Sequence, residues 1–345
     1  MVGEIVGRRR RRERPPERPP LLSFESWDRL PEVSPLIVQV CHPDWRGVRT
    51  VAYGFDTPVV ECDDLARWGT DLLAGVREAG VEVVVIQGWP PGSRSFVELL
   101  HPEGVKTACV LHSSPAQHGA EGGEATVVDE ILALSKSRTL DSVGMAKSGV
   151  HDALGALGYD IAVVPNRVPR LPKFEKLDLG PGLNVGVFAE PLWRKNLPTQ
   201  LLAVGMMDGA RAHMMRRPGL AYLGELDIVE HGELPWDQFI ALQGSVDLNL
   251  YVTLSECHPS TPQESYLAGV PCLISRVSSV FRDDPMLWDL TSVDEADNPS
   301  SIARGASRLL EAKDEAVSRA AAWMEAADRR GTEAWARFVS EVAAR

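Results

Sequence analysis

Short runs of Val, Ile and Leu alternate with longer amphipathic segments along almost the whole chain. Runs of the first kind are LIVQVCH at 36–42, EVVVIQG at 82–88 and LNVGVFA at 183–189. Between the first two, in DDLARWGTDLLAGVREAG, apolar residues recur every three or four positions, as in a helix that ends at Gly80. Strands that are continuously apolar are typical of parallel sheets covered by helices on both faces. The pattern therefore predicts an α/β fold with parallel sheets.

The same reasoning assigns the remaining segments. We expect strands at 36–42, 82–88, 106–115, 160–166, 183–189, 220–226, 246–254 and 271–277. We expect helices at 63–80, 127–137, 141–158, 197–210, 235–245, 264–270, 299–330 and 332–345.

One segment interrupts the alternation. NRVPRLPKFEKLDLGPG, at 166–182, holds three prolines, two glycines and no apolar period, which is typical of an interdomain linker. It divides the chain into an N-terminal domain at 23–165 and a C-terminal domain at 183–320. A final helix at 321–345 could pack back on the N-terminal domain.

The formal net charge of −12 is unevenly distributed. Residues 1–20, MVGEIVGRRRRRERPPERPP, carry seven Arg and three Glu, so the rest of the chain has a net charge of −16. The basic tail at 1–22 has little apolar content, and we expect it to be disordered. It could touch nucleic acid or an acidic surface, or it could be a solvated leader. The acidic body argues against nucleic-acid binding by the folded domains, because phosphate contacts need clustered Lys and Arg.

Cysteine use and hydropathy limit where the protein works. The five cysteines are widely spaced and form no C-x-x-C pair: Cys41, Cys62, Cys109, Cys257 and Cys272. This usage predicts free thiols in the core of a cytoplasmic protein, without disulfides or a zinc site. No run approaches the roughly 18 apolar residues of a membrane helix. There is no apolar signal region near the N-terminus either, so we expect neither a membrane span nor secretion.

Two glutamates, Glu256 and Glu264, flank seven residues after the predicted strand VDLNLYVTL. Ligands of open parallel sheets bind beyond the carboxyl ends of strands, where helix N-termini offer unpaired N–H groups. Glu264, expected to open the next helix, could accept both hydroxyls of a ribose. Glu256 could hold sugar hydroxyls, and the backbone N–H groups of Ser260, Thr261 and Gln263 could face a phosphate. Alternatively, Glu264 only complements the helix dipole and Glu256 is solvated.

The surrounding stretch, VDLNLYVTLSECHPSTPQESYLAGVPCLIS, resembles a known family. It is similar to the E-x7-E region of retaining, nucleotide-sugar-dependent glycosyltransferases of the GT-B fold (the group 1, family 4-like enzymes). VLHSSP, DIAVVPNRVP and LNVGVFAEPLWRKNLPTQLLAVG resemble three further motifs of that family, in the same order. The resemblance covers residues 150–285 well and the first 150 only in topology.

The resemblance implies two Rossmann-like domains that face each other across a cleft, with the donor on the second domain. Glu264 would bind the donor ribose, and Glu256 would orient the transferred sugar. Lys195 would neutralise the diphosphate as a point charge, although it could also be a solvated helix-start lysine. The family has a second basic residue five positions earlier, where this chain has Glu190. Arg194 is the candidate to replace it.

On the first domain the resemblance is weaker. His112 would contact the sugar and help to align the acceptor, or it could be a loop histidine with a structural partner. The family's glycine-rich loop is reduced to CHPDWRGVRTVAYG, where Gly47 is the best match and Arg46 or Arg49 could reach phosphate. Arg167 stands where the family's P-N-G-V motif has glycine.

The implied reaction moves a sugar from a nucleoside diphosphate sugar to a hydroxyl acceptor (small molecule, glycan, lipid or protein), with retention. In the front-face path favoured for this class, the departing phosphate oxygen takes the acceptor's proton, so no protein base is needed. The acidic pairs Asp63–Asp64 and Asp283–Asp284 lack companion ligands, so we expect them to be capping or surface features and predict no metal and no cofactor. The alternatives are a non-catalytic nucleotide-sugar-binding module, or an epimerase or phosphorylase on the same fold.

Overall fold

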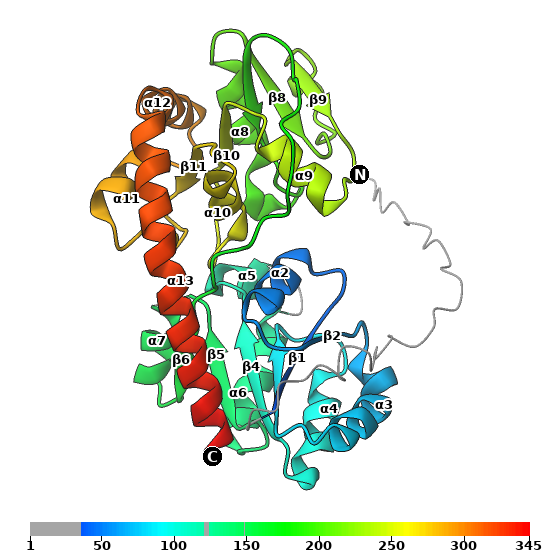
Figure 1. Ribbon diagram of the computed structural model, residues 1–345. Helices are drawn as coiled ribbons and strands as arrows, with labels where there is room; N and C mark the ends of the chain where they lie inside the picture. Colours follow the sequence, from blue (N-terminus) through cyan, green and yellow to red (C-terminus); the bar gives the residue numbers. More distant parts are fainter. Residues whose placement is uncertain (1–35, 121–123, 148) are drawn as a thin grey trace, which may run out of the picture.

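The computed structural model describes residues 36–120, 124–147 and 149–345 of the chain. The predicted basic tail at 1–22 and the first residues of the N-terminal domain lie outside these ranges. Two α/β domains are stacked one above the other, and a long C-terminal helix runs along both (Figure 1). The prediction of an α/β fold with parallel sheets is confirmed, because every strand pair in the described residues is parallel.

The first domain is built on a six-stranded sheet of order β2-β1-β3-β4-β5-β6. Its strands are β1 (Ile37–Cys41), β2 (Val59–Glu61), β3 (Val83–Gln87), β4 (Lys106–Leu111), β5 (Ser142–Met145) and β6 (Ile161–Val163). Its helices are α2 (Arg46–Gly54), α3 (Leu65–Glu78), α4 (Ser93–Leu100), α5 (Pro115–Ala120), α6 (Glu124–Lys136) and α7 (Val150–Ala156), with a 3-10 turn at His101–Glu103.

The second domain has a six-stranded sheet of order β12-β11-β10-β7-β8-β9. Its strands are β7 (Leu183–Gly186), β8 (Ala210–Met214), β9 (Ile228–Glu230), β10 (Leu248–Tyr251), β11 (Cys272–Ser275) and β12 (Ser292–Val293). The helices that follow are α8 (Leu197–Gly205), α9 (Trp236–Gln243), α10 (Ser260–Leu267), α11 (Pro285–Thr291), α12 (Pro299–Glu311) and α13 (Lys313–Ala343), with 3-10 turns at Trp193–Lys195 and Ala221–Leu223. Residues 166–182, between the domains, contain no helix or strand.

Strand order fixes where each sheet can bind a ligand. In the first sheet the order reverses between β1 and β3, and in the second between β7 and β10. Loops that leave the carboxyl ends of such neighbouring strands diverge to opposite faces of the sheet and open a crevice between them. The loops after β1, β7 and β10 are therefore the places to look for function.

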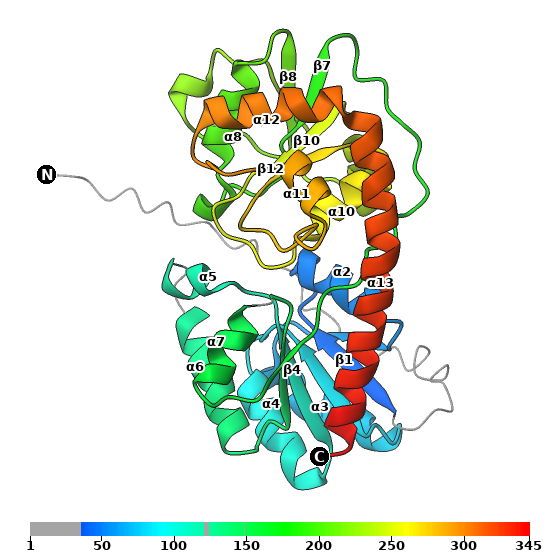
Figure 2. The same ribbon diagram turned by 90° about the vertical axis from the view of Figure 1, so that its left-hand side faces the viewer.

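The first sheet is buried on both faces. Val84 and Ile86 of β3 pack into a cluster with α3, α4 and α6, whereas Val83 and Val85 pack into a cluster with α2 and α13. This alternation is the two-residue period of a strand. The C-terminal helix α13 thus begins in the second domain and completes the core of the first (Figure 2).

The break between the last two helices differs from the prediction. The chain breaks at Ala312, and α13 then continues without interruption through the expected boundaries at 321 and at Gly331. A Cβ at Gly331 would lie 3.1 Å from the Arg167 Cγ atom. Glycine here allows the linker to approach the helix closely and does not end it.

Two further elements were wrongly predicted. The expected helix at 141–158 is the buried strand β5 followed by the short helix α7. A Cβ at Gly144 of β5 would lie 2.8 Å from the Val164 side chain, so its glycine meets a packing demand between strands. The expected strand at 220–226 contains a 3-10 turn instead. The strands on this side, β8 and β9, are short and partly polar, so no continuous apolar run in the sequence predicts them.

The cysteines and the hydropathy of the helices can be compared with the composition. All five cysteines are buried and free, as predicted. Among the described residues, no helix is long and apolar enough to cross a membrane.

Candidate functional site

The carboxyl ends of the two sheets face each other across the domain boundary. Contacts run from the loops after β4, β5 and β6 to the single loop that follows β10. Ser114 hydrogen-bonds Ser255 through their hydroxyls, and Lys147 donates to the backbone carbonyl of Glu256. Asn166 donates to the carbonyl oxygen of His258 at 2.8 Å. The loop after β10, which carries both predicted glutamates, is thus held by the first domain as well as by its own.

Glu256 lies at the centre of a buried polar cluster. Its Oε1 atom accepts from Lys195, from the Tyr251 hydroxyl at 3.1 Å and from Arg194 Nη1 at 3.4 Å. The side chains of Glu256, Lys195 and Arg194 are only 8–14% exposed. Burial lowers the pKa of Lys195, and Glu256 acts in the opposite direction. Two cationic side chains thus converge on Glu256 in a buried position, where they can also attract an anionic ligand.

The turn at Asn196 positions the neighbouring Lys195 in this cluster. Asn196 has a left-handed backbone, with φ of 56°, and forms the start of α8. Asparagine and glycine are the residues that adopt this conformation most readily, which accounts for a K-N or K-G dipeptide here. The Asn196 amide donates to the carbonyl of Val252 at 3.1 Å, just beyond β10. Gln200 reinforces the turn by donating to the Lys195 carbonyl at 2.7 Å.

Glu264 is buried apart from this cluster, inside α10. Its side chain is 4% exposed and its Oε2 atom has no hydrogen-bond partner; the nearest cation is Arg46 Nη2, at 3.9 Å. Burial raises the pKa of Glu264 to about 7, and Arg46 opposes that shift. An orphaned carboxylate oxygen in a buried position is costly unless a ligand donates to it.

The expected start of this helix at Glu264 was wrong. α10 begins at Ser260, so Ser260, Thr261 and Gln263 form its first turns and Glu264 lies within it. Ser260 and Thr261 are partly buried, whereas Gln263 is fully buried and donates to the Pro259 carbonyl at 3.2 Å. The first N–H groups of a helix lack partners within it, so these residues keep their predicted capacity to meet a phosphate.

The predicted acceptor-side loop is mostly helix α2, and only part of it reaches the second domain. Gly47 lies in that helix, has no positive φ and would tolerate a Cβ without contact within 4 Å, so it is not a glycine-rich turn. Arg49 instead donates to the Pro43 carbonyl at 2.8 Å, within its own domain. Arg46 is the residue that crosses: its guanidinium lies 4.5 Å from the Trp236 ring and 4.0 Å from the Phe239 ring of the second domain.

His112 follows β4 on the first-domain side. Its Nε2 atom hydrogen-bonds Gln87 Oε1 at 2.8 Å. Burial lowers the pKa of His112 to about 4, and nearby His258 contributes to that shift. The imidazole is therefore neutral at pH 7 and stands across the domain boundary from the Glu256 loop.

The acidic pairs have structural roles in the described residues. Asp64 caps α3 by accepting from the Ala66 N–H at 2.9 Å, and Asp284 caps α11 by accepting from the Leu287 N–H at 3.0 Å. Throughout the described parts of the chain, no group of three or more His, Cys, Asp or Glu side chains is arranged to hold a metal ion.

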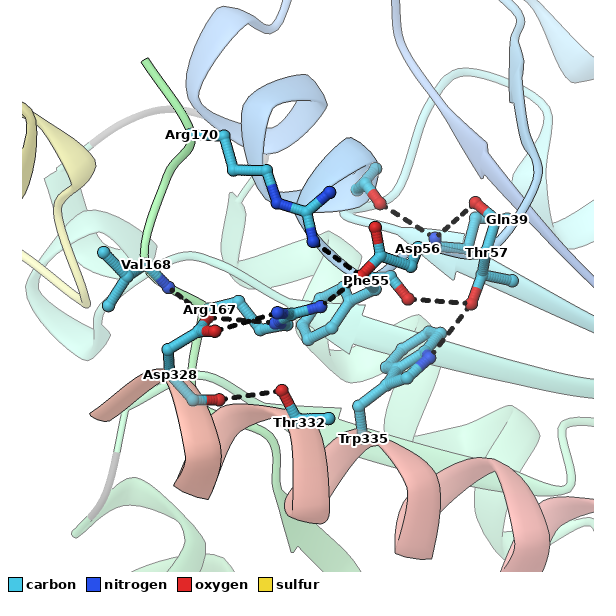
Figure 3. Close-up of polar contacts among 11 residues, drawn as sticks. Gln39, Phe55, Asp56, Thr57, Arg167, Val168, Arg170, Asp328, Thr332 and Trp335 are labelled. Carbon is cyan, nitrogen blue, oxygen red and sulfur yellow. Dashed lines mark hydrogen bonds and ion pairs between the residues drawn. The ribbon is translucent and has the colours of Figure 1, made fainter. Parts of the chain in front are cut away.

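Arg167, which replaces a glycine of the family motif, clamps the linker (Figure 3). It binds Asp328 of α13 through two parallel hydrogen bonds of 3.0 and 2.9 Å, and Asp56 of the first domain at 2.7 Å. Arg170 reaches the same Asp56 carboxylate at 2.9 Å. Below them, Trp335 donates to the Thr57 hydroxyl at 3.1 Å. The clamp joins linker, first domain and C-terminal helix.

Three contributors to the site were missed from the sequence. Tyr251 was read only as a strand residue, and Trp236 only as part of a helix. Lys147 was placed inside the wrongly predicted helix at 141–158. Had DSVGM been recognised as a strand, Lys147 would have followed its carboxyl end, which is the signal used for the other site residues.

Comparisons with known proteins bear on the fold. No protein-family model matches the sequence, and no curated protein matches it significantly. Several solved structures superpose over most of their length. An OtsA apo structure is 12% identical with a TM-score of 0.60, covering 89% of this chain and 98% of that chain. A sucrose-phosphate synthase from Thermosynechococcus elongatus is 13% identical with a TM-score of 0.61, covering 83% and 82%. A glycosyltransferase from Rickettsia africae is 11% identical with a TM-score of 0.60, covering 89% and 97%.

At sequence identities of 11–13%, structural similarity shows a shared fold. The superposition covers 98% of the OtsA chain and 97% of the Rickettsia africae glycosyltransferase chain, each with a TM-score of 0.60. The chain therefore has the GT-B fold that its motifs predict.

Proposed function

We propose that this protein is a retaining glycosyltransferase that moves a sugar from a nucleoside diphosphate sugar to a hydroxyl acceptor. Glu264 holds a buried carboxylate whose Oε2 atom has no hydrogen-bond partner. The observation that carries the proposal is the buried cluster in which Lys195 and Arg194 both contact the carboxylate of Glu256. It lies on the loops after β7 and β10, at the strand reversal where this fold class binds ligands.

Each charge matches one part of such a donor. Lys195 and Arg194 would hold the diphosphate, whose negative charge grows as the sugar departs. Glu256 would bind sugar hydroxyls from within the same cluster. Glu264 would accept both ribose hydroxyls, replacing its long contact with Arg46. The first turns of α10, at Ser260, Thr261 and Gln263, would add backbone N–H groups near the phosphates.

Retention by a front-face path fits the groups available. His112 is neutral at pH 7 because burial lowers its pKa to about 4. His112 can therefore align an acceptor by hydrogen bonding. The phosphate oxygen of the leaving group, and not His112, then serves as the base that takes the acceptor's proton. We propose that Lys195 and Arg194 supply the charge stabilisation and that no metal or cofactor takes part.

Two solved structures support this choice of donor and stereochemistry. One is a trehalose-6-phosphate protein from E. coli bound with UDP-2-fluoro glucose, 13% identical with a TM-score of 0.56. The other concerns glycosyltransfer with retention by trehalose-6-phosphate synthase, 14% identical with a TM-score of 0.53. Together with the sucrose-phosphate synthase, they make monosaccharide phosphates the first acceptors to test.

The test is a matrix of UDP, GDP, ADP and dTDP sugars against sugars, sugar phosphates, glycans and lipids. Release of the nucleoside diphosphate only when an acceptor is present, with an unchanged anomeric configuration in the product by NMR, is expected. EDTA should leave the rate unchanged. Thermal protection by a donor without turnover would indicate a binding module, and isomerised donor would indicate an epimerase. If no donor binds or reacts, the proposal is wrong.

A further inference from the structure

Two buried glutamines connect His112 to the backbone of the first domain. Gln39 of β1 and Gln87 of β3 are fully buried. The Gln39 amide nitrogen donates to the carbonyl oxygens of Ala52 at 2.9 Å and Thr57 at 3.3 Å, as Figure 3 shows for the Thr57 end. The Gln87 amide nitrogen donates to Gln39 Oε1 at 2.7 Å, and Gln87 Oε1 contacts His112 Nε2 at 2.8 Å.

The chain of hydrogen bonds has a fixed direction. Backbone carbonyls can only accept, so Gln39 must present its NH2 group to Ala52 and Thr57. Its oxygen then faces Gln87, which must donate with its own NH2 group. The Gln87 oxygen is left to face His112. Rotating either amide group by 180° would place two hydrogen-bond acceptors against each other in a buried position. Neither acceptor would then receive a hydrogen bond there, which is costly.

The last link decides which imidazole nitrogen carries the proton. An oxygen acceptor at 2.8 Å from Nε2 requires a hydrogen on that atom. In a neutral imidazole the other nitrogen, Nδ1, is then an acceptor. The structure gives Nδ1 no partner among the described residues, and His112 is partly exposed at the carboxyl end of β4. Nδ1 is therefore the atom left for a ligand.

We propose that Gln39 and Gln87 are positioning residues that lock His112 as the Nε2–H tautomer, so that Nδ1 accepts a hydrogen bond from a ligand hydroxyl. This rests on the proposed function only for the identity of the ligand, a hydroxyl of the donor sugar or the acceptor. An ether or an ionised phosphate oxygen cannot donate, so the locked tautomer selects for a hydroxyl at that place.

The neutral state of His112 is consistent with the lock. Burial, followed by the influence of His258, lowers its pKa to about 4. The pKa of His258 is likewise lowered to about 4 by burial. Both rings therefore stay neutral between pH 6 and pH 9, where a tautomer can be observed without protonation.

The test is ¹⁵N NMR of histidine-labelled full-length protein without any substrate, with the His112 signals assigned by His112→Gln. We expect one tautomer, protonated at Nε2 and constant from pH 6 to pH 9. Gln87→Leu should release it into a mixture of tautomers. Gln87→Glu, whose protonated form keeps the acceptor and the donor, should restore the Nε2–H form. Thr107→Val, a buried polar-to-apolar change in β4 of the same sheet, should leave it unchanged.

A wild-type spectrum with the proton on Nδ1, or with both tautomers, would overturn the inference even if every variant failed to fold. In the transfer assay, Gln87→Leu should lower kcat about ten-fold or more with less than a two-fold change in donor KM, and Gln87→Glu should recover most of it. Equal loss in both variants would assign Gln87 a merely structural role. Absence of any transfer by the wild type refutes the proposed function and leaves the tautomer result to stand alone.

Discussion

Two clusters of charge in the described residues resemble each other in composition and differ in burial. The clamp at the linker joins Arg167 and Arg170 to Asp56 and Asp328, two cations to two anions. Arg170 is 70% exposed and Asp56 is 52% exposed, so water screens much of the attraction. A balanced and hydrated network of this kind costs little to form and needs no ligand.

The cluster around Glu256 is the opposite case. Lys195 and Arg194 share one carboxylate on Glu256, and all three side chains are at most 14% exposed. Burying charged side chains costs several kcal/mol per ion, which attraction between them offsets only in part. An anionic ligand bound to Lys195 and Arg194 would offset that cost, and this is why the cluster around Glu256 and not the clamp is assigned to the donor. Substitutions in the two clusters should therefore differ in their effects on kcat, nucleotide affinity and stability.

The largest effect is expected at Glu256. Glu256→Gln should lower kcat about 10²–10³-fold, because the contact to the reacting sugar is lost at the transition state. Affinity for the nucleoside diphosphate product should stay the same or rise, since losing the negative charge of Glu256 strengthens the attraction of Lys195 and Arg194 for the diphosphate. Steady-state rates and calorimetric titration with UDP, GDP, ADP and dTDP separate the two effects. A rate within five-fold of wild type would remove Glu256 from the mechanism.

Substitution of Lys195 should weaken nucleoside diphosphate binding, whereas substitution of Glu256 should lower kcat. Lys195→Met removes a charged hydrogen-bond donor worth about 1.5–3 kcal/mol, which weakens nucleoside diphosphate affinity about 10- to 150-fold. The matched control is Lys173→Met at an exposed position of the linker, which should change affinity less than two-fold. Equal affinities in the two variants would contradict a diphosphate site at Lys195.

Most of the proposed donor site can be predicted from the sequence, because its residues lie on elements that follow one another closely along the chain. A buried strand, a loop with Glu256 and a helix with Glu264 follow one another within about twenty residues. The K-N dipeptide at Lys195 is local too, since Asn196 needs only its own left-handed backbone. The helix start was misplaced at Glu264 because the proline at position 262 was read as part of a loop, although a proline fits the first turn of a helix.

The rest depends on contacts between residues far apart in sequence. Arg46 meets Trp236 and Phe239 only after the two domains face each other. The hydrogen bonds from Gln39 through Gln87 to His112 join three neighbouring strands, and no spacing along the chain reveals them. Such positions have no periodic signal, because Gln39 and Gln87 are each a single polar residue in an otherwise apolar strand.

A smaller effect, about ten-fold, is expected from pH acting on Glu264. Burial raises the pKa of its carboxyl to about 7, so at pH 6 most of it is protonated and cannot accept two ribose hydroxyls. Nucleotide affinity should therefore rise about ten-fold between pH 6 and pH 8. The carboxyl holds its proton more tightly folded than unfolded, so its ionisation also makes the protein less stable as pH rises from 4.5 to 7.

The control for this pH effect is Glu264→Gln. It should bind nucleotide weakly and without the Glu264-dependent rise, which separates this carboxyl from the titration of the nucleotide itself. His112 and His258 stay neutral in the window, because the pKa of each is lowered to about 4 by burial. If wild type and Glu264→Gln show the same pH profile, Glu264 does not bind the ribose.

The smallest effect is expected at the clamp, where Arg167→Ala should change stability and spare chemistry. Arg167 is 12% exposed and makes two hydrogen bonds to Asp328, so its loss should cost about 1–2 kcal/mol of unfolding free energy. Its contact with the half-exposed Asp56 adds little, because solvent screens it. Urea unfolding measures the loss, and Arg170→Ala, at 70% exposure, should change stability by less than about 0.5 kcal/mol. Both variants should keep kcat within two-fold, because neither side chain meets the donor. A large fall in kcat with unchanged stability would show instead that the clamp controls how the two domains close over the substrate.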